Sequence, residues 1–116
     1  MGSPTSRSLE RLRKDGYVAQ VVERWNPYAR VRIDLFGFID IIVMGKGLQG
    51  IIGIQATSVG NVSARIKKIY AIPEAKIWLE CGNKIYVHGW GKKGKKDERK
   101  LWNLTVKEIT LGDLIL

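Results

Sequence analysis

Two apolar stretches separated by a glycine-rich turn constrain the fold of this chain more than any other feature of its sequence. The first stretch covers residues 34–43 and the second covers residues 51–58. The intervening segment 45–50 contains three glycines, which are typical of a turn. Together these segments predict a β-hairpin that carries acid, amide and hydroxyl groups on an otherwise apolar face.

The register of this hairpin decides which polar groups meet. Side chains alternate between the two faces of a strand, so Gln55 and Thr57 share one face of the returning strand. If the turn is centred between Gly47 and Leu48, Asp40 lies opposite Gln55. Direct cross-strand partners have Cβ atoms about 4.5–5.5 Å apart, close enough to share one ion.

This pair suits a magnesium ion, which takes oxygen ligands and usually only one or two carboxylates. Asp40 supplies a carboxylate and Gln55 a carbonyl oxygen, and either Asp34 or Glu10 can supply a second carboxylate. Such an ion positions a water as nucleophile and neutralises charge on a phosphate. In the competing interpretation both residues are structural: Asp40 caps a bend, and Gln55 forms hydrogen bonds within the sheet. An unpaired buried carboxylate is costly, which favours the metal site.

The charge of the chain indicates a polyanionic partner. Twenty Lys and Arg oppose eleven Asp and Glu, which gives a formal net charge of +9 in 116 residues. Nucleic acid is the expected partner, either for an enzyme or for a basic ribonucleoprotein component. The expected contacts are the helix residues Arg7, Arg11, Arg13 and Lys14, Arg65 of a later helix, and Lys92, Lys93, Lys95 and Lys96 of a basic loop over residues 91–100. None of them suggests base-specific recognition.

Length and composition predict one folded domain over residues 1–116, with residues 1–5 disordered. No apolar run reaches the roughly 20 residues that span a bilayer, so we expect no membrane partner. The start of the chain lacks the apolar core of a signal peptide, and a single cysteine allows no internal disulfide. An intracellular, cytoplasmic protein is therefore expected.

The predicted elements alternate between helices and strands. A helix over residues 9–15 begins at Ser6 or Ser8 and ends at Gly16. A second helix covers residues 62–71, with Asn61 as its cap and Pro73 as its end. The expected strands cover residues 17–25, 30–33 with a bent continuation to 43, 51–58, 76–81, 84–90 and 102–110, with Gly82-Asn83 as a hairpin turn. This order predicts an α/β fold with a mixed β-sheet flanked by helices.

The polar residues of the hairpin carry a resemblance to a known superfamily. A helix with Glu10, a strand with Asp40 and a returning strand with Gln55 and Thr57 resemble the PD-(D/E)XK nucleases. Within that superfamily the chain is similar to the Holliday junction resolvases of archaea and their phage relatives. The longer similar blocks are residues 22–27, 34–40, 55–58 and 87–90.

The resemblance implies a restriction-endonuclease-like fold and a Mg²⁺-dependent endonuclease, with Mn²⁺ as a second usable ion. It implies a four-way DNA junction as the substrate and a phage gene expressed in a host cell as one source. Two symmetric nicks need two active sites, so a homodimer is expected. We expect Leu111, Leu114, Ile115 and Leu116 to contribute apolar surface to that dimer.

Three departures from the superfamily pattern affect the site. Ile39 replaces the proline, Gln55 replaces an acid and Thr57 replaces the lysine. The cation that the motif lysine would supply must then come from another residue. A helical wheel of residues 62–71 favours Lys68 for this role, and Arg65 after it. If neither reaches the site, the chain is a non-catalytic nucleic-acid-binding domain on the same fold. The expected catalytic residues are Asp40, Gln55, Lys68 and Glu10, and the expected metal ligands are Asp40, Gln55, Glu10 and Asp34.

Three further residues have simpler interpretations. Glu23 is either an additional acid near the site or, as we favour, part of a salt bridge on a strand surface. His88, the only histidine, is expected to be structural. Cys81 is expected to be a small buried residue.

Overall fold

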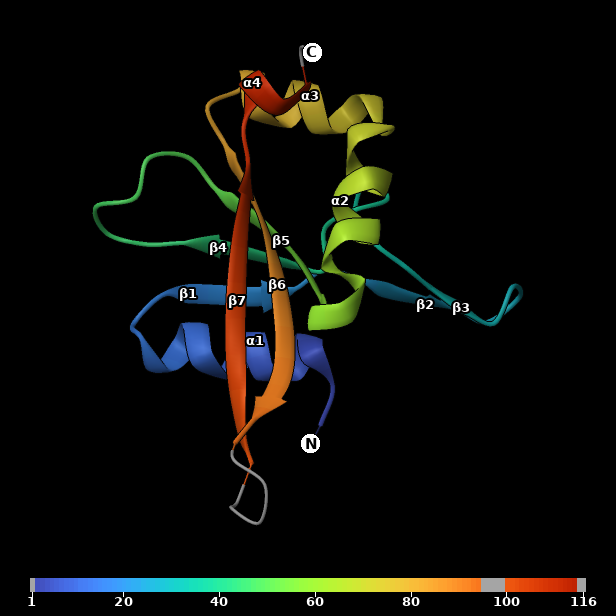
Figure 1. The fold of residues 1–116 in the computed structure, drawn as a ribbon. Coiled ribbons are helices and arrows are strands. Elements are labelled where there is room, and N and C mark those ends of the chain that lie inside the picture. The colour runs from blue at the N-terminus through green and yellow to red at the C-terminus, as the bar shows by residue number, and fades with distance from the viewer. Residues whose placement is uncertain (1, 95–99, 115–116) are drawn as a thin grey trace.

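The structure is a computed structural model that describes residues 2–94 and 100–114. Five strands form one mixed sheet in the order β1-β4-β5-β6-β7, and β2 pairs with β3 in a separate two-stranded ribbon (Figure 1). The elements in chain order are α1 (Pro4–Lys14), β1 (Val18–Val21), β2 (Arg24–Asn26), β3 (Val31–Ile33), β4 (Ile41–Met44), β5 (Ile52–Ser58), the 3₁₀ turn η1 (Val59–Asn61), α2 (Val62–Tyr70), α3 (Pro73–Glu80), β6 (Lys84–Lys93), β7 (Leu101–Ile109) and α4 (Leu111–Leu114).

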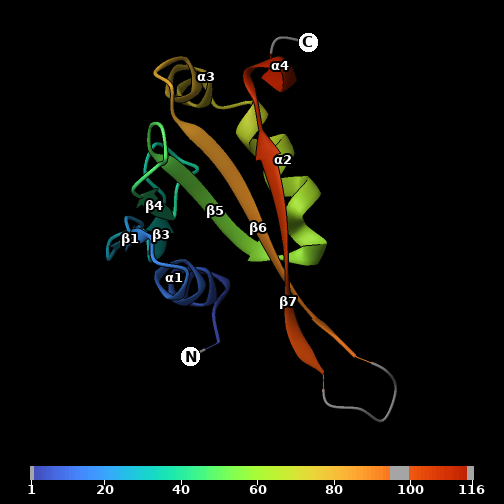
Figure 2. The same ribbon diagram turned by 90° about the vertical axis from the view of Figure 1, so that its left-hand side faces the viewer.

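Helices cover both faces of the main sheet, as the two views in Figures 1 and 2 show. On one face Leu12 of α1 packs against Ile41, Val43, Ile52 and Ile54. On the other face a larger cluster joins α2 and α3 to β6 and to the Phe38–Ile39 segment. The expected α/β architecture with a mixed sheet between helices is therefore confirmed.

Only one pair of neighbouring strands in this sheet is parallel. β5 pairs with β6 in parallel from Ile52↔Lys84 to Ser58↔Trp90, and the other three pairs are antiparallel. A parallel pair needs a crossover connection, which η1, α2 and α3 provide over one face of the sheet. This crossover places α2 on the face of the sheet that contains β5 and β6.

The predicted hairpin and its register are confirmed. β4 and β5 pair as Ile41↔Ile54, Ile42↔Gly53 and Val43↔Ile52, the register that sets residue 40 against residue 55. The turn between the strands contains Gly47 and Gly50 with φ of 88° and 74°. These are left-handed conformations that glycine adopts without steric penalty.

The first helix begins earlier than expected. It starts at Pro4, and the side chain of Ser3, rather than Ser6 or Ser8, caps it by accepting a bond from the Ser6 backbone N–H at 3.0 Å. Residues 4 and 5 are thus helical and not disordered. Proline fixes φ near its helical value and lacks the N–H that a first turn cannot use, so Pro4 was the signal for this start. Gly16 follows the helix with φ of 94°, as expected.

The region between α1 and β4 folds differently from the two long strands expected there. The strand predicted for residues 17–25 divides into β1 and β2, and the bent strand predicted for residues 30–43 divides into β3 and β4. Between β3 and β4 the chain doubles back, with a bridge between Leu35 and Ile39. Phe36 and Gly37 have φ of 54° and 84°, so the segment reverses direction here instead of continuing as one bent strand.

The strand predicted for residues 76–81 is wrong, because this segment belongs to α3. Ala75 and Leu79, four residues apart, are the buried residues of this helix, which is a helical period. Pro73 begins α3 in addition to closing α2. Gly82-Asn83 therefore joins a helix to a strand, and the side-chain carbonyl of Asn83 accepts a bond from the Ile51 N–H at 2.9 Å.

One smaller expectation, for Cys81, also fails. Cys81 is exposed at the end of α3 rather than buried. Leu111 and Leu114 are partly buried and pack against the larger core cluster, and Ile115 and Leu116 lie outside the described residues, so the dimer surface expected there stays a prediction. Within residues 2–94 and 100–114, none of the helices combines the length and the apolar character that crossing a membrane requires.

Candidate metal centre

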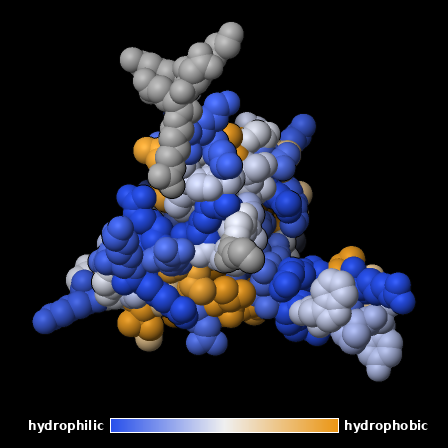
Figure 3. Space-filling view, turned by 90° about the horizontal axis from the view of Figure 1, so that it is seen from below, coloured by the Kyte–Doolittle hydropathy of each residue, from blue (hydrophilic) through white to orange (hydrophobic). Residues whose placement is uncertain are grey.

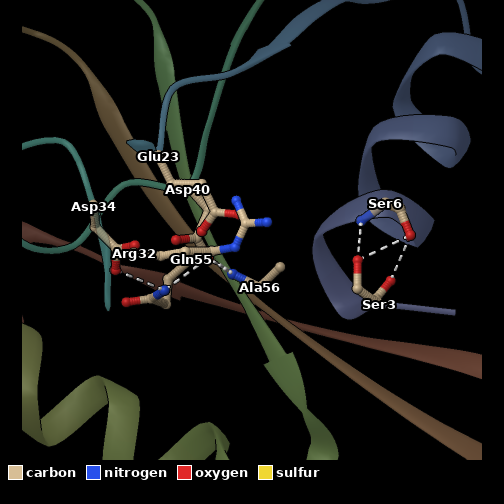
Figure 4. Close-up of polar contacts among 8 residues, drawn as sticks. All are labelled: Ser3, Ser6, Glu23, Arg32, Asp34, Asp40, Gln55 and Ala56. Carbon is tan, nitrogen blue, oxygen red and sulfur yellow. Dashed lines mark hydrogen bonds and ion pairs between the residues drawn. The ribbon is translucent and has the colours of Figure 1, made fainter. Parts of the chain in front are cut away.

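Asp40 is the buried centre of the polar site. It directly precedes β4, is 3% exposed, and its backbone N–H donates to the Ile54 carbonyl at 2.8 Å. Its carboxylate oxygen Oδ2 accepts two bonds, from Gln55 Nε2 at 2.7 Å and from the Ala56 backbone N–H at 2.8 Å. Figure 4 shows this arrangement. The hairpin register thus brings Asp40 and Gln55 together, as the sequence predicts.

Gln55 connects Asp40 to Asp34. Its Nε2 also donates to Asp34 Oδ2 at 3.3 Å, and the residue is 2% exposed. Its side-chain carbonyl oxygen Oε1 is buried and has no hydrogen-bond partner among the residues that the structure describes. A buried carbonyl without a donor is unfavourable, so this oxygen is a group in need of a ligand.

Three carboxylates converge at this point. One oxygen from each of Glu23, Asp34 and Asp40 lies within 4.8 Å of the others. Asp34 reaches the cluster because the chain doubles back between Leu35 and Ile39, not because residues 34–40 stay extended. Glu23 reaches it from the link between β1 and β2 and also pairs with Arg32 at 3.6 Å. It is therefore both a salt-bridge partner and a member of the cluster.

The convergence changes the acidity of Asp40. Burial, and then the hydrogen bond and negative charge of Asp34, raise the pKa of Asp40 from 3.8 to about 8, against the lowering effect of the bonds from Ala56 and Gln55. A carboxyl group in this state holds a proton at neutral pH unless a cation replaces it. Ionised Asp40 therefore needs a compensating positive charge at the site.

Lys68 lies at the edge of the cluster. Its Nζ is 3.9 Å from Asp34 Oδ2, and its side chain is 45% exposed. The structure places this lysine at the site, as expected from the helical wheel, while its catalytic role stays a prediction. Arg65 is partly buried on the same helix, and Thr57, at the position of the motif lysine, is 4% exposed.

Glu10 is not a member of the three-carboxylate cluster. It is exposed on α1, where it lines a hollow together with Arg7, Lys14 and Trp102. Glu23 joins the cluster, although from the sequence a surface salt bridge is favoured for Glu23 and a ligand role is expected of Glu10. The available signal was the position of Glu23 directly after two valines at the end of a strand, where an acid is partly buried.

The basic residues expected to bind nucleic acid have different environments. Arg13 donates two bonds to the Ala19 carbonyl, at 2.9 and 3.2 Å, so it links α1 to β1. Arg7, Arg11 and Lys14 line the hollow beside α1, and Lys92 and Lys93 are exposed at the end of β6. Lys95 and Lys96 lie outside the described residues.

The donor set suits a hard divalent cation. Glu23, Asp34, Asp40 and Gln55 offer only oxygen ligands, which Mg²⁺ and Mn²⁺ prefer. The unpartnered Gln55 Oε1 is the observation that tests this fit, since turning the amide over would replace Nε2 by Oε1 beside the carboxylates, where a cation would satisfy it. The Asp40 and Asp34 oxygens already lie beside the same amide group.

Comparisons of the chain with protein-family models, with curated proteins and with solved structures found no match. The class of protein is therefore inferred from the side chains of the site.

Proposed function

We propose that this chain is a divalent-metal-dependent, structure-selective DNA endonuclease on a restriction-endonuclease-like fold. Within that class a Holliday junction resolvase acting as a homodimer is the best candidate. The observation that carries the proposal is the buried Gln55 amide, whose Nε2 lies against the Asp34 and Asp40 carboxylates and whose Oε1 has no partner among the described residues. The net charge of +9 supplies the attraction to a phosphate backbone.

Asp40, Asp34 and Gln55 would hold Mg²⁺ or Mn²⁺, with Glu23 as the fourth oxygen donor. When bound there, the ion supplies an activated water and neutralises charge on the scissile phosphate. The protein must first release the proton that burial and Asp34 keep on Asp40. The Ala56 N–H holds the Asp40 carboxylate in place during this exchange.

Lys68 replaces the motif lysine in this proposal. Its ammonium group now faces Asp34 at 3.9 Å, and because the side chain is half exposed it can turn toward a phosphate bound next to Asp34. There it would stabilise the negative charge that develops on the phosphate oxygens. Thr57 carries no charge and is buried, so it cannot take this role.

A cleavage assay on a labelled four-way junction tests the proposal. Wild-type protein with Mg²⁺ should nick the junction and leave a linear duplex of the same sequence intact. Asp40→Asn should abolish nicking, and Lys68→Ala should slow it by roughly 10²-fold, the typical effect of removing one electrostatic stabiliser. Lys67→Ala is the matched control, because Lys67 is the adjacent exposed lysine of α2 and should have little effect.

The possible results separate the alternatives. Junction binding without Mg²⁺-dependent nicking would support the non-catalytic nucleic-acid-binding domain instead. Nicking that survives in Asp40→Asn would place the active site elsewhere. Equal loss in Lys67→Ala and Lys68→Ala would indicate that these lysines only attract DNA.

A further inference from the structure

A second candidate site lies on the face of the sheet opposite the three-carboxylate cluster. Ile54 packs with α1, so its neighbour Gln55 points to the α2 face, where Lys68 reaches Asp34. On the α1 face, a hollow of about 280 Å³ opens between α1 and the ribbon formed by β6 and β7. Its lining consists of Arg7, Glu10, Arg11, Lys14, Trp90 and Trp102.

The floor of this hollow is buried, hydrogen-bonded and uncharged. Trp90 is 6% exposed, and its indole N–H donates to Ser8 Oγ at 2.8 Å. Ser8 Oγ in turn lies 2.9 Å from His88 Nδ1, and both residues are buried. Burial and the nearby Arg11 charge lower the pKa of His88 to about 4, so the imidazole is neutral at physiological pH. This hydrogen-bonded row fixes α1 against β6.

The rim of the hollow is an exposed aromatic ring stacked with cations. Trp102 on β7 is 45% exposed and pairs across the ribbon with Lys92. The Arg7 guanidinium carbon lies 3.5 Å from the centre of the Trp102 ring, and Lys92 Nζ lies 5.1 Å from it. Aromatic rings and guanidinium planes are the two surfaces on which nucleobases stack in proteins.

The charge around the hollow complements a phosphate chain. Three of the lining residues are basic, Arg7, Arg11 and Lys14, and one, Glu10, is acidic. Lys92 adds a further positive charge beside the ring. Figure 3 looks onto the α1 side from below and shows mostly hydrophilic residues around an apolar patch. Aromatic and basic groups combined in this way fit a base with its neighbouring phosphates better than they fit an apolar peptide.

We propose that the Trp102–Arg7 stack binds an unpaired nucleotide of a single-stranded DNA segment, with Arg11, Lys14 and Lys92 contacting the flanking phosphates. The proposal takes DNA as the partner from the proposed function. It is separate from cleavage, because the stack lies on the opposite face from the carboxylates and binding there needs no divalent ion. The α1 face thereby holds an unpaired segment while the α2 face meets the scissile phosphate.

The test is binding of a fluorescently labelled oligothymidylate to the full chain in EDTA, measured by fluorescence anisotropy. Trp102→Ala should weaken binding roughly tenfold, since one base–aromatic stack is worth about that much. Trp25→Ala is the matched control, because Trp25 is 54% exposed on the other ribbon and should leave binding unchanged. Trp102→Phe should restore most of the affinity, because the phenyl ring still stacks.

An abasic oligonucleotide of the same length separates stacking from charge. Wild type and Trp102→Ala should bind it equally, because it offers phosphates but no bases. Trp102→Leu, which keeps apolar bulk without an aromatic ring, serves if the alanine variant does not fold. If the wild type and either variant bind oligothymidylate equally, the proposal is overturned. It is also overturned if the substitution weakens binding of the abasic strand as much as it weakens binding of oligothymidylate.

This result is independent of the nuclease assay. Trp102-dependent binding in a protein that never nicks a junction would contradict the proposed function alone. Normal nicking together with Trp102-independent binding would contradict only the stacking site.

Discussion

Replacing Asp40 by asparagine should stabilise the metal-free protein. The wild-type carboxyl group has its pKa raised from 3.8 to about 8 by burial and by Asp34. Asparagine has nearly the same shape, and its Oδ1 can still accept the bonds from Ala56 and Gln55. Folding of the wild type costs free energy because the Asp40 carboxylate must be buried in its charged form or take up a proton. Asp40→Asn removes this cost and leaves the packing unchanged.

The pKa values give the size and sign of the effect. Since the folded-state pKa of Asp40 is raised, the unfolded chain loses its proton first, near pH 3.8, and the folded chain keeps it to about pH 8. The wild type therefore loses stability relative to Asp40→Asn as the pH rises through this window, by up to about 1.4 kcal/mol per pH unit. At pH 7 the difference is about 4 kcal/mol, a shift in Tm of more than ~10 °C.

Urea unfolding of both proteins in EDTA at several pH values measures this difference. The two free energies of unfolding should coincide near pH 4 and separate steadily toward pH 8. Adding Mg²⁺ at pH 7 should raise the Tm of the wild type but not that of Asp40→Asn, because binding at a hundredfold excess over Kd adds about 2.7 kcal/mol. A pH-independent difference, or none at pH 7, would refute the assigned state of Asp40.

Two further predictions concern stability away from the carboxylates. In Asp40→Asn, where the first effect is absent, lowering the pH from about 6.5 to 4 should remove up to about 3 kcal/mol, because the pKa of His88 is lowered to about 4 and the unfolded chain gains its proton first. Urea unfolding measures this loss, and a flat profile in that window would contradict it. Gly50→Ala should destabilise by more than ~2 kcal/mol, since its φ is 74° and a Cβ there would overlap the Gly82 carbonyl. Gly47→Ala, with φ of 88° but open space around it, should lose only about 1 kcal/mol by thermal unfolding, and equal losses would refute the role of the overlap.

The central hairpin was predictable because its information is local. Two apolar strands and three glycines define the turn, and the period of two then sets Asp40 against Gln55. The lysine on α2 was predictable for a similar reason, since the helical period places Lys68 on the flank of the buried stripe. Local periodicity thus accounts for the positions of Asp40, Gln55 and Lys68 at the site.

Other parts of the site depend on contacts that periodicity does not record. Asp34 joins the cluster through a reversal in which Phe36, a bulky residue, adopts a positive φ. Such a conformation is rarely used by non-glycine residues and must be stabilised by the surrounding packing. The sequence of α3 does not distinguish a helix from a strand, because a short segment rich in Ile, Trp and Leu is ambiguous, and its buried residues become clear only against the sheet.

The parallel pairing of β5 and β6 has a consequence for synthesis on the ribosome. β5 ends at Ser58, but the strand that closes its free edge begins only at Lys84, after α2 and α3. At about 5–20 residues per second, this edge of a highly apolar strand stays unpaired for a few seconds in each nascent chain. The strand that carries Gln55 is therefore exposed to intermolecular pairing during translation, although in the finished protein it lies at the centre of the sheet.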